Sequence, residues 1–194
     1  MRRVYPIEAE SYRILRGMVD LSHLGPLSRA VAERVIHASA DPEYADTLAL
    51  AETALQSGLE ALHRGVPIVT DVHMVAAGIT ARKALCYISD PRTRQFAEDL
   101  GATRSATGFR IAATEVGDGA VWVVGNAPTA LFELLELNIE PALVIGLPVG
   151  FVGAAESKER LIESRLPAVA NQGPKGGSAV AAAAVNALLY FEEG

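Results

Sequence analysis

The 194-residue sequence contains one cysteine, few aromatic residues and no long hydrophobic run. A single cysteine, Cys86, excludes an internal disulfide and any zinc site built from several thiolates. Cys86 lies in the apolar run ALCYI, where a small buried hydrophobic residue is the ordinary interpretation. Sparse cysteine is compatible with a reducing compartment, and we expect a cytoplasmic protein.

Signal-peptide and membrane-spanning patterns are also missing. Glutamates follow the N-terminal arginines before any hydrophobic core forms. The longest uncharged stretches, Pro141–Ala155 and Gly176–Phe191, are shorter than the ~18 residues of a spanning helix. We therefore expect no membrane partner.

Positive charge is in deficit, because 17 Lys and Arg stand against 23 Asp and Glu, a formal net charge of −6. This balance argues against nucleic acid and anionic lipid as general partners. Half of the residues are hydrophobic, which excludes disorder and suffices for one domain over residues 1–194. No internal repeat or linker divides the chain.

Five short apolar runs predict strands that are buried on both faces, since they are rich in β-branched residues and nearly continuous. They are Val66–Thr70, Ala84–Ile88, Val121–Val124, Ala142–Leu147 and Pro167–Ala170. Helical stretches precede and separate them, at Ile7–Asp20, Ser28–His37, Tyr44–His63, Pro91–Leu100, Thr103–Arg110, Ala127–Leu137, Ala155–Glu163 and Ser178–Phe191. The alternation predicts an α/β fold: a flavodoxin-like, doubly wound, parallel five-stranded sheet with helices on both faces and N-terminal helices.

In such a sheet the ligand lies at the carboxyl ends of the strands, so the segments after the runs are informative. These segments are TDVHM, GNAPTAL, GLPVGFVGAAESKE and NQGPKGGS. In the last one, Ser178 is a predicted N-cap, and the preceding amides with Lys175 would form an anion cradle. For any single loop an ordinary turn remains the alternative.

Nucleotide fingerprints are absent: no G-x-G-x-x-G occurs, and GPKGGS is not a phosphate-binding loop. The anion is therefore better interpreted as a carboxylate. Asp71 and His73 could supply two metal ligands, but no third is visible, so we expect no metal. A hydrolase nucleophile elbow is also missing.

His37 lies three residues after Arg34, which places both side chains on one helix face. Histidine is suited to giving and taking a proton near neutral pH. The alternative is a half-buried histidine bonded to Ser39 or Asp41. Arg104, near a helix N-terminus, would suit a ligand carboxylate, or is an ordinary surface arginine.

Six segments, taken in order, resemble the precorrin-8X methylmutase family, which includes the cobalt-precorrin-8 methylmutases. The resemblance extends from Ser11 to the C-terminal helix and rests on RVIHASADPEYAD, IVTDVHMVAAGI, TRSAT, VVGNAPTALFELLEL, PALVIGLPVGFVGAAESKE and GPKGGSAVAAAAVNALL. It implies an isomerase that moves a methyl group from C11 to C12 of a corrin precursor. Precorrin-8X becomes hydrogenobyrinate, or its cobalt-containing equivalent, without a redox cofactor, nucleotide or protein-bound metal.

The resemblance implies that His37 protonates the macrocycle and that Ser11, Arg34 and Arg104 contact the substrate, a tetrapyrrole polycarboxylate. Lys175 would pair with a further carboxylate. The strand-end rule adds pocket-lining residues: Thr70, Asp71, Asn126, Gly150, Gly176 and Gly177. The resemblance also implies a homodimer with substrate near the subunit interface, and neighbouring pathway enzymes are expected partners.

Two other functions use the same residues. A carrier could bind a tetrapyrrole through these arginines and loops without catalysis. A phosphoacceptor protein of the response-regulator type would explain Asp71 after a strand, but the acidic pair and lysine motif of such proteins are missing.

Overall fold

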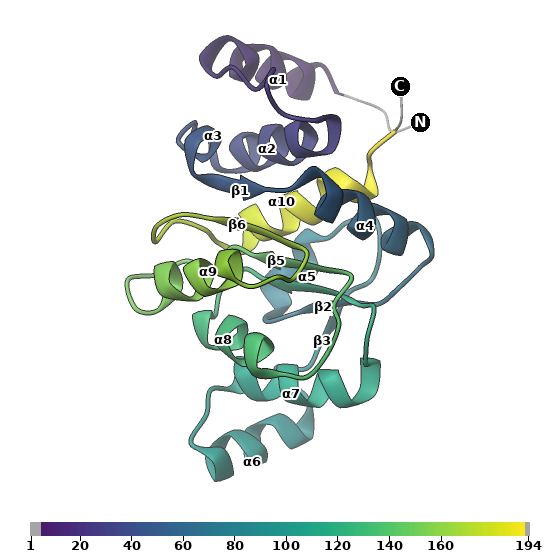
Figure 1. Ribbon diagram of the computed structural model, residues 1–194, viewed down its shortest axis with the longest axis vertical. Coiled ribbons are helices and arrows are strands. Elements are labelled where there is room, and N and C mark those ends of the chain that lie inside the picture. The colour runs from purple at the N-terminus through teal and green to yellow at the C-terminus, as the bar shows by residue number, and fades with distance from the viewer. Residues whose placement is uncertain (1–4, 193–194) are drawn as a thin grey trace.

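A six-stranded sheet forms the middle of the computed structural model, which describes residues 5–192 (Figure 1). The strand order is β1-β6-β5-β4-β2-β3, with β1 antiparallel to β6 and every other pair parallel. The strands are β1 (Leu48–Leu50), β2 (Ile68–Thr70), β3 (Leu85–Cys86), β4 (Val121–Val124), β5 (Leu143–Gly146) and β6 (Ala168–Asn171).

Helices cover both faces of the sheet. One face carries α2 (Pro26–Ser39), α4 (Glu52–His63), α5 (His73–Gly78) and α10 (Ser178–Leu189), with α1 (Pro6–Met18) on the outside of α2. The other face carries α7 (Arg104–Val116), α8 (Pro128–Glu136) and α9 (Ala154–Glu163), with α6 (Pro91–Leu100) beyond α7. The α/β class and the two-sided coverage predicted from the sequence are therefore confirmed.

The strands have the composition that burial on both faces requires. Val121 and Val123 of β4 point into the core beneath α10, whereas Trp122 and Val124 pack against α7 and α8. All four are fully buried. A continuous apolar run, rather than an alternating one, is what a strand between two helical layers needs.

The predicted strand number was wrong, since the sheet has a sixth strand inside the segment that we expected to be one helix, Tyr44–His63. That segment is α3 (Tyr44–Thr47), then β1, then α4. Leu48 and Leu50 of β1 pair with Asn171 and Val169 of β6. Leucine and alanine favour helix locally, and pairing with a distant strand overrides that preference.

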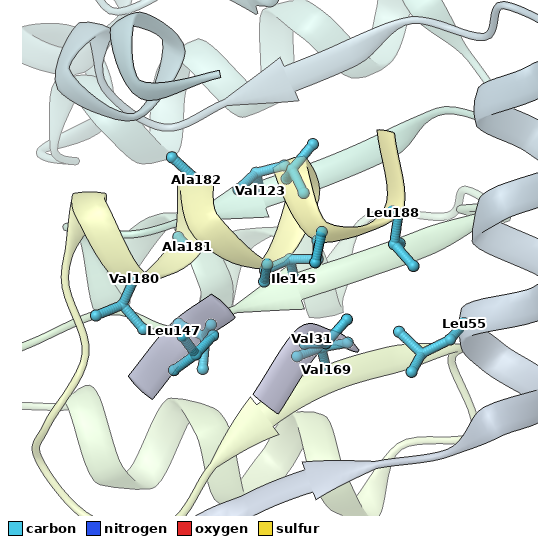
Figure 2. Packing of buried hydrophobic residues seen from close by; sticks show 14 of the residues in the cluster. Val31, Leu55, Val123, Ile145, Leu147, Val169, Val180, Ala181, Ala182 and Leu188 are labelled. Carbon is cyan, nitrogen blue, oxygen red and sulfur yellow. The ribbon is translucent and has the colours of Figure 1, made fainter. Parts of the chain in front are cut away.

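Helix α10 lies between the sheet and α2, and its small side chains make this possible. Ten of its twelve residues are buried, and most of those are alanine or valine. Figure 2 shows Ala181, Ala182 and Leu188 of α10 among sheet residues such as Val123 and Ile145. Close approach also needs glycine: a Cβ on Gly78 would lie 2.6 Å from the Ala182 Cβ.

Helix α2, which carries His37, receives its N-terminal cap from another helix. Its N-cap residue is Gly25, which has no side chain to cap the first turn. Instead the Glu52 carboxylate of α4 accepts hydrogen bonds from the backbone N–H groups of Leu27 (2.8 Å) and Ser28 (2.9 Å). Partial burial would raise the Glu52 pKa, but a bond from the Ser28 hydroxyl (2.6 Å) and these two backbone bonds lower it. The carboxylate also stabilises the positive end of the helix dipole.

No helix within residues 5–192 is long and apolar enough to cross a membrane.

Truncation of a buried α10 side chain tests the central place of this helix. Leu188 is fully buried, so Leu188→Ala is expected to lower the free energy of unfolding by about 2–5 kcal/mol. For a chain of this size the loss corresponds to a fall in Tm of roughly 5–15 °C. Leu100→Ala, at a leucine that is 54% exposed, is the matched control. Equal melting temperatures for both variants in calorimetry would contradict the packing described here.

Candidate functional site

His37 is held in place by two residues of α1. The Ser11 hydroxyl lies 2.8 Å from His37 Nδ1, within hydrogen-bond distance. The Tyr12 ring stacks on the imidazole, with centroids 4.9 Å apart and planes inclined by 12°. The alternative in which Ser39 or Asp41 binds His37 is not what the structure shows, because Ser39 donates to the carbonyls of Val35 and Ile36. Ser11, Tyr12 and His37 are called the His37 cluster below.

The His37 cluster opens onto a small cavity of about 140 Å³. Apart from Ser11 and His37, its walls are apolar and come from α1, α2 and the turn after α2 (Ile14, Leu15, Met18, Val19, Ile36, Ala40 and Pro42). A larger cavity of about 700 Å³ shares Met18, Val19 and Pro42 with it. The lining of the larger cavity includes acidic residues, among them Asp20, Glu43 and Asp46.

Arg34, one helical turn before His37, lines a different cavity of about 280 Å³, together with Tyr12 and Tyr190. Its guanidinium lies 5.5 Å from the centre of the Tyr190 ring and 3.9 Å from a carboxylate oxygen of Glu8. Tyr12 thus stands between the cavity of Arg34 and the cavity of His37. The shared helix face predicted from the spacing brings the two residues near each other without placing them in one cavity.

The Asp71 side chain binds the backbone of the segment after β4 and does not line a pocket. Its side chain is 1% exposed and accepts hydrogen bonds from the backbone N–H groups of Gly125 (3.2 Å), Asn126 (2.8 Å) and Ala127 (2.7 Å). Burial raises the Asp71 pKa, while these donors oppose the rise. Thr70 is equally buried and bonds to the Leu85 carbonyl. The predicted pocket-lining role of the Thr70 and Asp71 side chains is therefore corrected. Asn126, which was predicted to line the pocket with them, is exposed.

The segments after β5 and β6 are joined backbone to backbone. The Gly150 amide donates to the Pro174 carbonyl (3.1 Å), and the Gly177 amide donates to the Leu147 carbonyl (2.8 Å). Gly176 has φ +159°, and a Cβ there would collide with the carbonyl oxygens of Leu147 and Pro148. The structure brings the predicted glycines Gly150, Gly176 and Gly177 together, but the Gly177 amide is used within the protein.

Lys175 connects the segment after β6 to the turn that follows His37. Its ammonium lies 2.6 Å from Asp41 Oδ2 and 2.7 Å from Glu43 Oε2. These bonds raise the Lys175 pKa, and the bond to Lys175 lowers the Asp41 pKa. The predicted anion cradle is modified accordingly, because Lys175 already has two carboxylate partners. The predicted cap is also corrected: Gly177 is the N-cap of α10, and Ser178 is the first residue of the helix.

Arg104 lies away from the His37 cluster. It is the first residue of α7 and lines a cavity of about 470 Å³ with Arg94 and Glu98. Thr103, not Arg104, caps α7 through its hydroxyl, which accepts from the Ala106 amide at 3.3 Å. Within one chain, Arg104 and His37 do not line a common cavity.

The Asp71–His73 pair does not form a metal centre in the described chain. His73 Nε2 bonds to the Ser89 hydroxyl at 2.9 Å, while Asp71 is directed at backbone amides. Within residues 5–192 no three His, Cys, Asp or Glu side chains gather as potential metal ligands.

Two residues of this region were missed by the sequence analysis. Tyr12 follows Ser11 directly, and nothing in the local pattern indicates its stacking on a residue of another helix. Lys158 is fully buried in α9. Helical periodicity could have found it, because Ala154, Lys158 and Leu161 fall on one face, which is the buried face.

The precorrin-8X methylmutase family model matches residues 6–191. A cobalt-precorrin-8 methylmutase from Salmonella typhimurium is 46% identical, covering 95% of this chain and 93% of the relative. A cobalt-precorrin-8 methylmutase from Methanothermobacter thermautotrophicus is 44% identical, with 97% and 94% covered. The solved precorrin-8X methylmutase from Thermus thermophilus superimposes with a TM-score of 0.85 at 35% identity, covering 94% of this chain and 93% of that one.

Replacement of Asp71 tests its role beneath the site. Asp71→Ala leaves three backbone N–H groups without their acceptor, and we expect the free energy of unfolding to fall by about 1–3 kcal/mol. Asp71→Asn keeps one acceptor oxygen, so its free energy of unfolding should lie between those of Asp71→Ala and the wild type. Asp99→Ala, at an exposed aspartate of α6, is the control in urea denaturation. If Asp71→Ala unfolds like this control, the segment after β4 does not depend on Asp71.

Proposed function

The chain belongs to the precorrin-8X methylmutase family, and from this premise we propose that His37 is the group that exchanges a proton with the substrate. Members of this family are isomerases, and this chain catalyses the methyl rearrangement of their step in cobalamin biosynthesis. The finer assignment of C11-to-C12 migration, which yields hydrogenobyrinate from precorrin-8X, follows the resemblance set out above. The geometry of the His37 cluster carries the residue assignment.

The hydrogen bond to Ser11 favours Nε2 as the reacting atom of His37. A hydroxyl can donate to Nδ1 or accept from it, so the bond persists whether the ring is neutral or protonated. Nδ1 is thereby committed to orientation, and Nε2 is left to give the proton to the macrocycle and recover it afterwards. Tyr12, stacked on the ring, fixes its plane and is favourably placed for the protonated form.

Recognition of the substrate carboxylates is assigned to Arg34, Arg104, Asn126 and the segment around Lys175. Charge-assisted bonds from guanidinium to carboxylate are strong and directional. Arg34 and Lys175 already face acidic side chains of the chain, so a substrate carboxylate would share or displace these partners. No ion pair of Arg104 is found within residues 5–192, so a substrate carboxylate would meet less competition there than at Arg34 or Lys175.

The methylmutase reaction is favoured over a non-catalytic carrier. A carrier requires arginines and an apolar surface, but it has no need of a histidine whose ring is held by a hydrogen bond and an aromatic stack. The two relatives reported above are named as enzymes, not as carriers.

Turnover of precorrin-8X, followed by the appearance of the corrin absorption spectrum, tests this function. His37→Ala is expected to lower kcat by a factor of about 10²–10⁴ because it removes the proton donor. Ser11→Ala removes one hydrogen bond and should lower kcat by only about 3–10-fold. The assignment is wrong if folded His37→Ala retains wild-type turnover. His63→Ala, at an exposed histidine of α4, is the control.

We also propose that the working form is a homodimer. The His37 cavity of about 140 Å³ is too small for a macrocycle, since pockets for drug-sized ligands measure ~300–1,000 Å³. The adjoining cavity of about 700 Å³ is large enough, but its lining includes Asp20, Glu43 and Asp46, whose charges are unfavourable for a polycarboxylate. A second copy could complete the site and bring Arg104 to it. The segment after β5 supplies an apolar surface for such contact, with Phe151 100% and Val152 88% exposed.

Light scattering during size-exclusion chromatography tests the dimer. The wild type is expected at twice the monomer mass, and Phe151→Asp at the monomer mass, because a charge would be buried in the interface. Ile7→Asp, at another exposed apolar residue, is the control. A monomeric wild type that turns over substrate would overturn this proposal and leave the methylmutase function intact.

A cytoplasmic location and transfer of product to a neighbouring pathway enzyme complete the proposal. Both rest on the family and on the sparse cysteine. Cell fractionation and co-purification with pathway enzymes test them.

A further inference from the structure

Lys158 is a fully buried lysine that the mechanism above does not use. It lies on the inner face of α9, one turn after Ala154. Its ammonium donates to Asn171 Oδ1 at 3.0 Å and to the backbone carbonyl of Lys175 at 2.5 Å. No carboxylate lies within ion-pair distance of it among residues 5–192. Burying a charge without a counter-ion costs free energy, so the hydrogen bonds to Asn171 and to the Lys175 carbonyl are needed to compensate this cost.

Asn171 and Lys158 act on the same carbonyl. The Asn171 side-chain amide donates to the Gln172 carbonyl and to the Lys175 carbonyl, each at 3.0 Å. The Lys175 carbonyl therefore accepts two hydrogen bonds from buried side chains. Together they fix the course of the chain from the end of β6 to Lys175.

The segment of residues 172–177 contacts two other parts of the proposed substrate site. Forward along the chain, Gly177 is bonded to Leu147, which joins it to the segment after β5. Through its side chain, Lys175 reaches Asp41 and Glu43, which follow His37 by four and six residues. The Lys158 ammonium thus holds the backbone of a residue whose side chain binds the His37 turn.

We propose that Lys158 is a positioning residue for substrate binding. Its buried ammonium fixes residues 172–177, and through them the Lys175 side chain, in the arrangement that receives a carboxylate of the substrate. This inference rests on the proposed function, and it assigns Lys158 an effect on binding rather than on the proton transfer at His37.

The ionisable groups that surround Lys158 are paired with other residues or exposed, so the titration of Lys158 can be followed separately from theirs. Burial lowers the Lys158 pKa from 10.5 to about 8. The acids of the adjacent α8, Glu133 and Glu136, are paired with Arg110 and Arg160. On α9 itself, Glu156, Glu159 and Glu163 are exposed, and β6 presents the neutral Asn171. Lys175 is held by its own acidic partners.

The first test measures KM and kcat of Lys158→Met with precorrin-8X. Loss of the charge-assisted bond is expected to raise KM about tenfold or more while kcat changes by less than about threefold. Lys158→Gln, whose amide can donate to the Lys175 carbonyl, should restore part of the loss. Glu159→Met, the same new side chain at the next and exposed position of α9, should behave as wild type.

A second readout does not depend on turnover. Titration with hydrogenobyrinate should give a Kd for Lys158→Met about tenfold above that of the wild type. Amide hydrogen exchange of residues 172–177 should be faster in the variant, while exchange in β4 and β5 is unchanged. A folded variant with wild-type KM, Kd and exchange in this segment overturns the inference. Absence of turnover in the wild type would instead overturn the proposed function.

A third readout, the pH dependence of KM, uses the wild type alone and therefore does not depend on correct folding of the variants. Above a pH of about 8 the ammonium loses its proton and its bond to the carbonyl weakens, so KM should rise several-fold by a pH of about 9.5. Over the same range the unfolded chain binds more protons than the folded one, so stability from this residue rises. Binding and stability are thus expected to move in opposite directions. A wild-type KM that is flat over this range contradicts the proposal.

Discussion

The thickness of the layer formed by α10 is the constraint on which the rest of the structure depends. Because most side chains of α10 are alanine or valine, α2 can lie close to the sheet through it. The end of α2 places His37 beside α1, and the cap that begins α2 comes from Glu52 of α4. The position of the His37 imidazole therefore depends on packing among α2, α4 and α10, and Ser11 and Tyr12 add its final orientation.

The cations around the His37 cluster are balanced by acidic side chains of the same molecule. Arg16, Arg34 and Lys175 are each already close to acidic side chains of the same molecule. The free chain thus holds these cations at little electrostatic cost. The surplus of acids behind the net charge of −6 extends to this region, because Lys175 faces two carboxylates and the adjoining cavity is lined by Asp20 and Asp46. The potential that a ligand meets depends on these local arrangements more than on the total.

Local pattern predicted those parts of the molecule that local physics determines. The buried strands β2, β4, β5 and β6 follow from continuous apolar runs. Helix α6 has the predicted bounds, Pro91–Leu100, and in the structure Asp90 caps its first turn and Gly101 follows its last. Strand β1 and the Glu52 cap could not be predicted, because each depends on a partner more than twenty residues away. For the same reason Ser11 and His37 were predicted through the family resemblance, whereas the Tyr12 stack and the ion pairs of Lys175 were not predicted at all.

Both edges of the sheet are very short. β1 has three residues and β3 has two, so neither presents a long row of unpaired backbone groups to another molecule. Strand-to-strand addition between copies of the chain, which can lead to open-ended aggregation, is thereby disfavoured. The dimer contact proposed above instead uses a side-chain surface around Phe151, and a two-fold contact of that kind is closed once two copies have met. The brevity of the two outer strands thus protects the molecule from polymerisation.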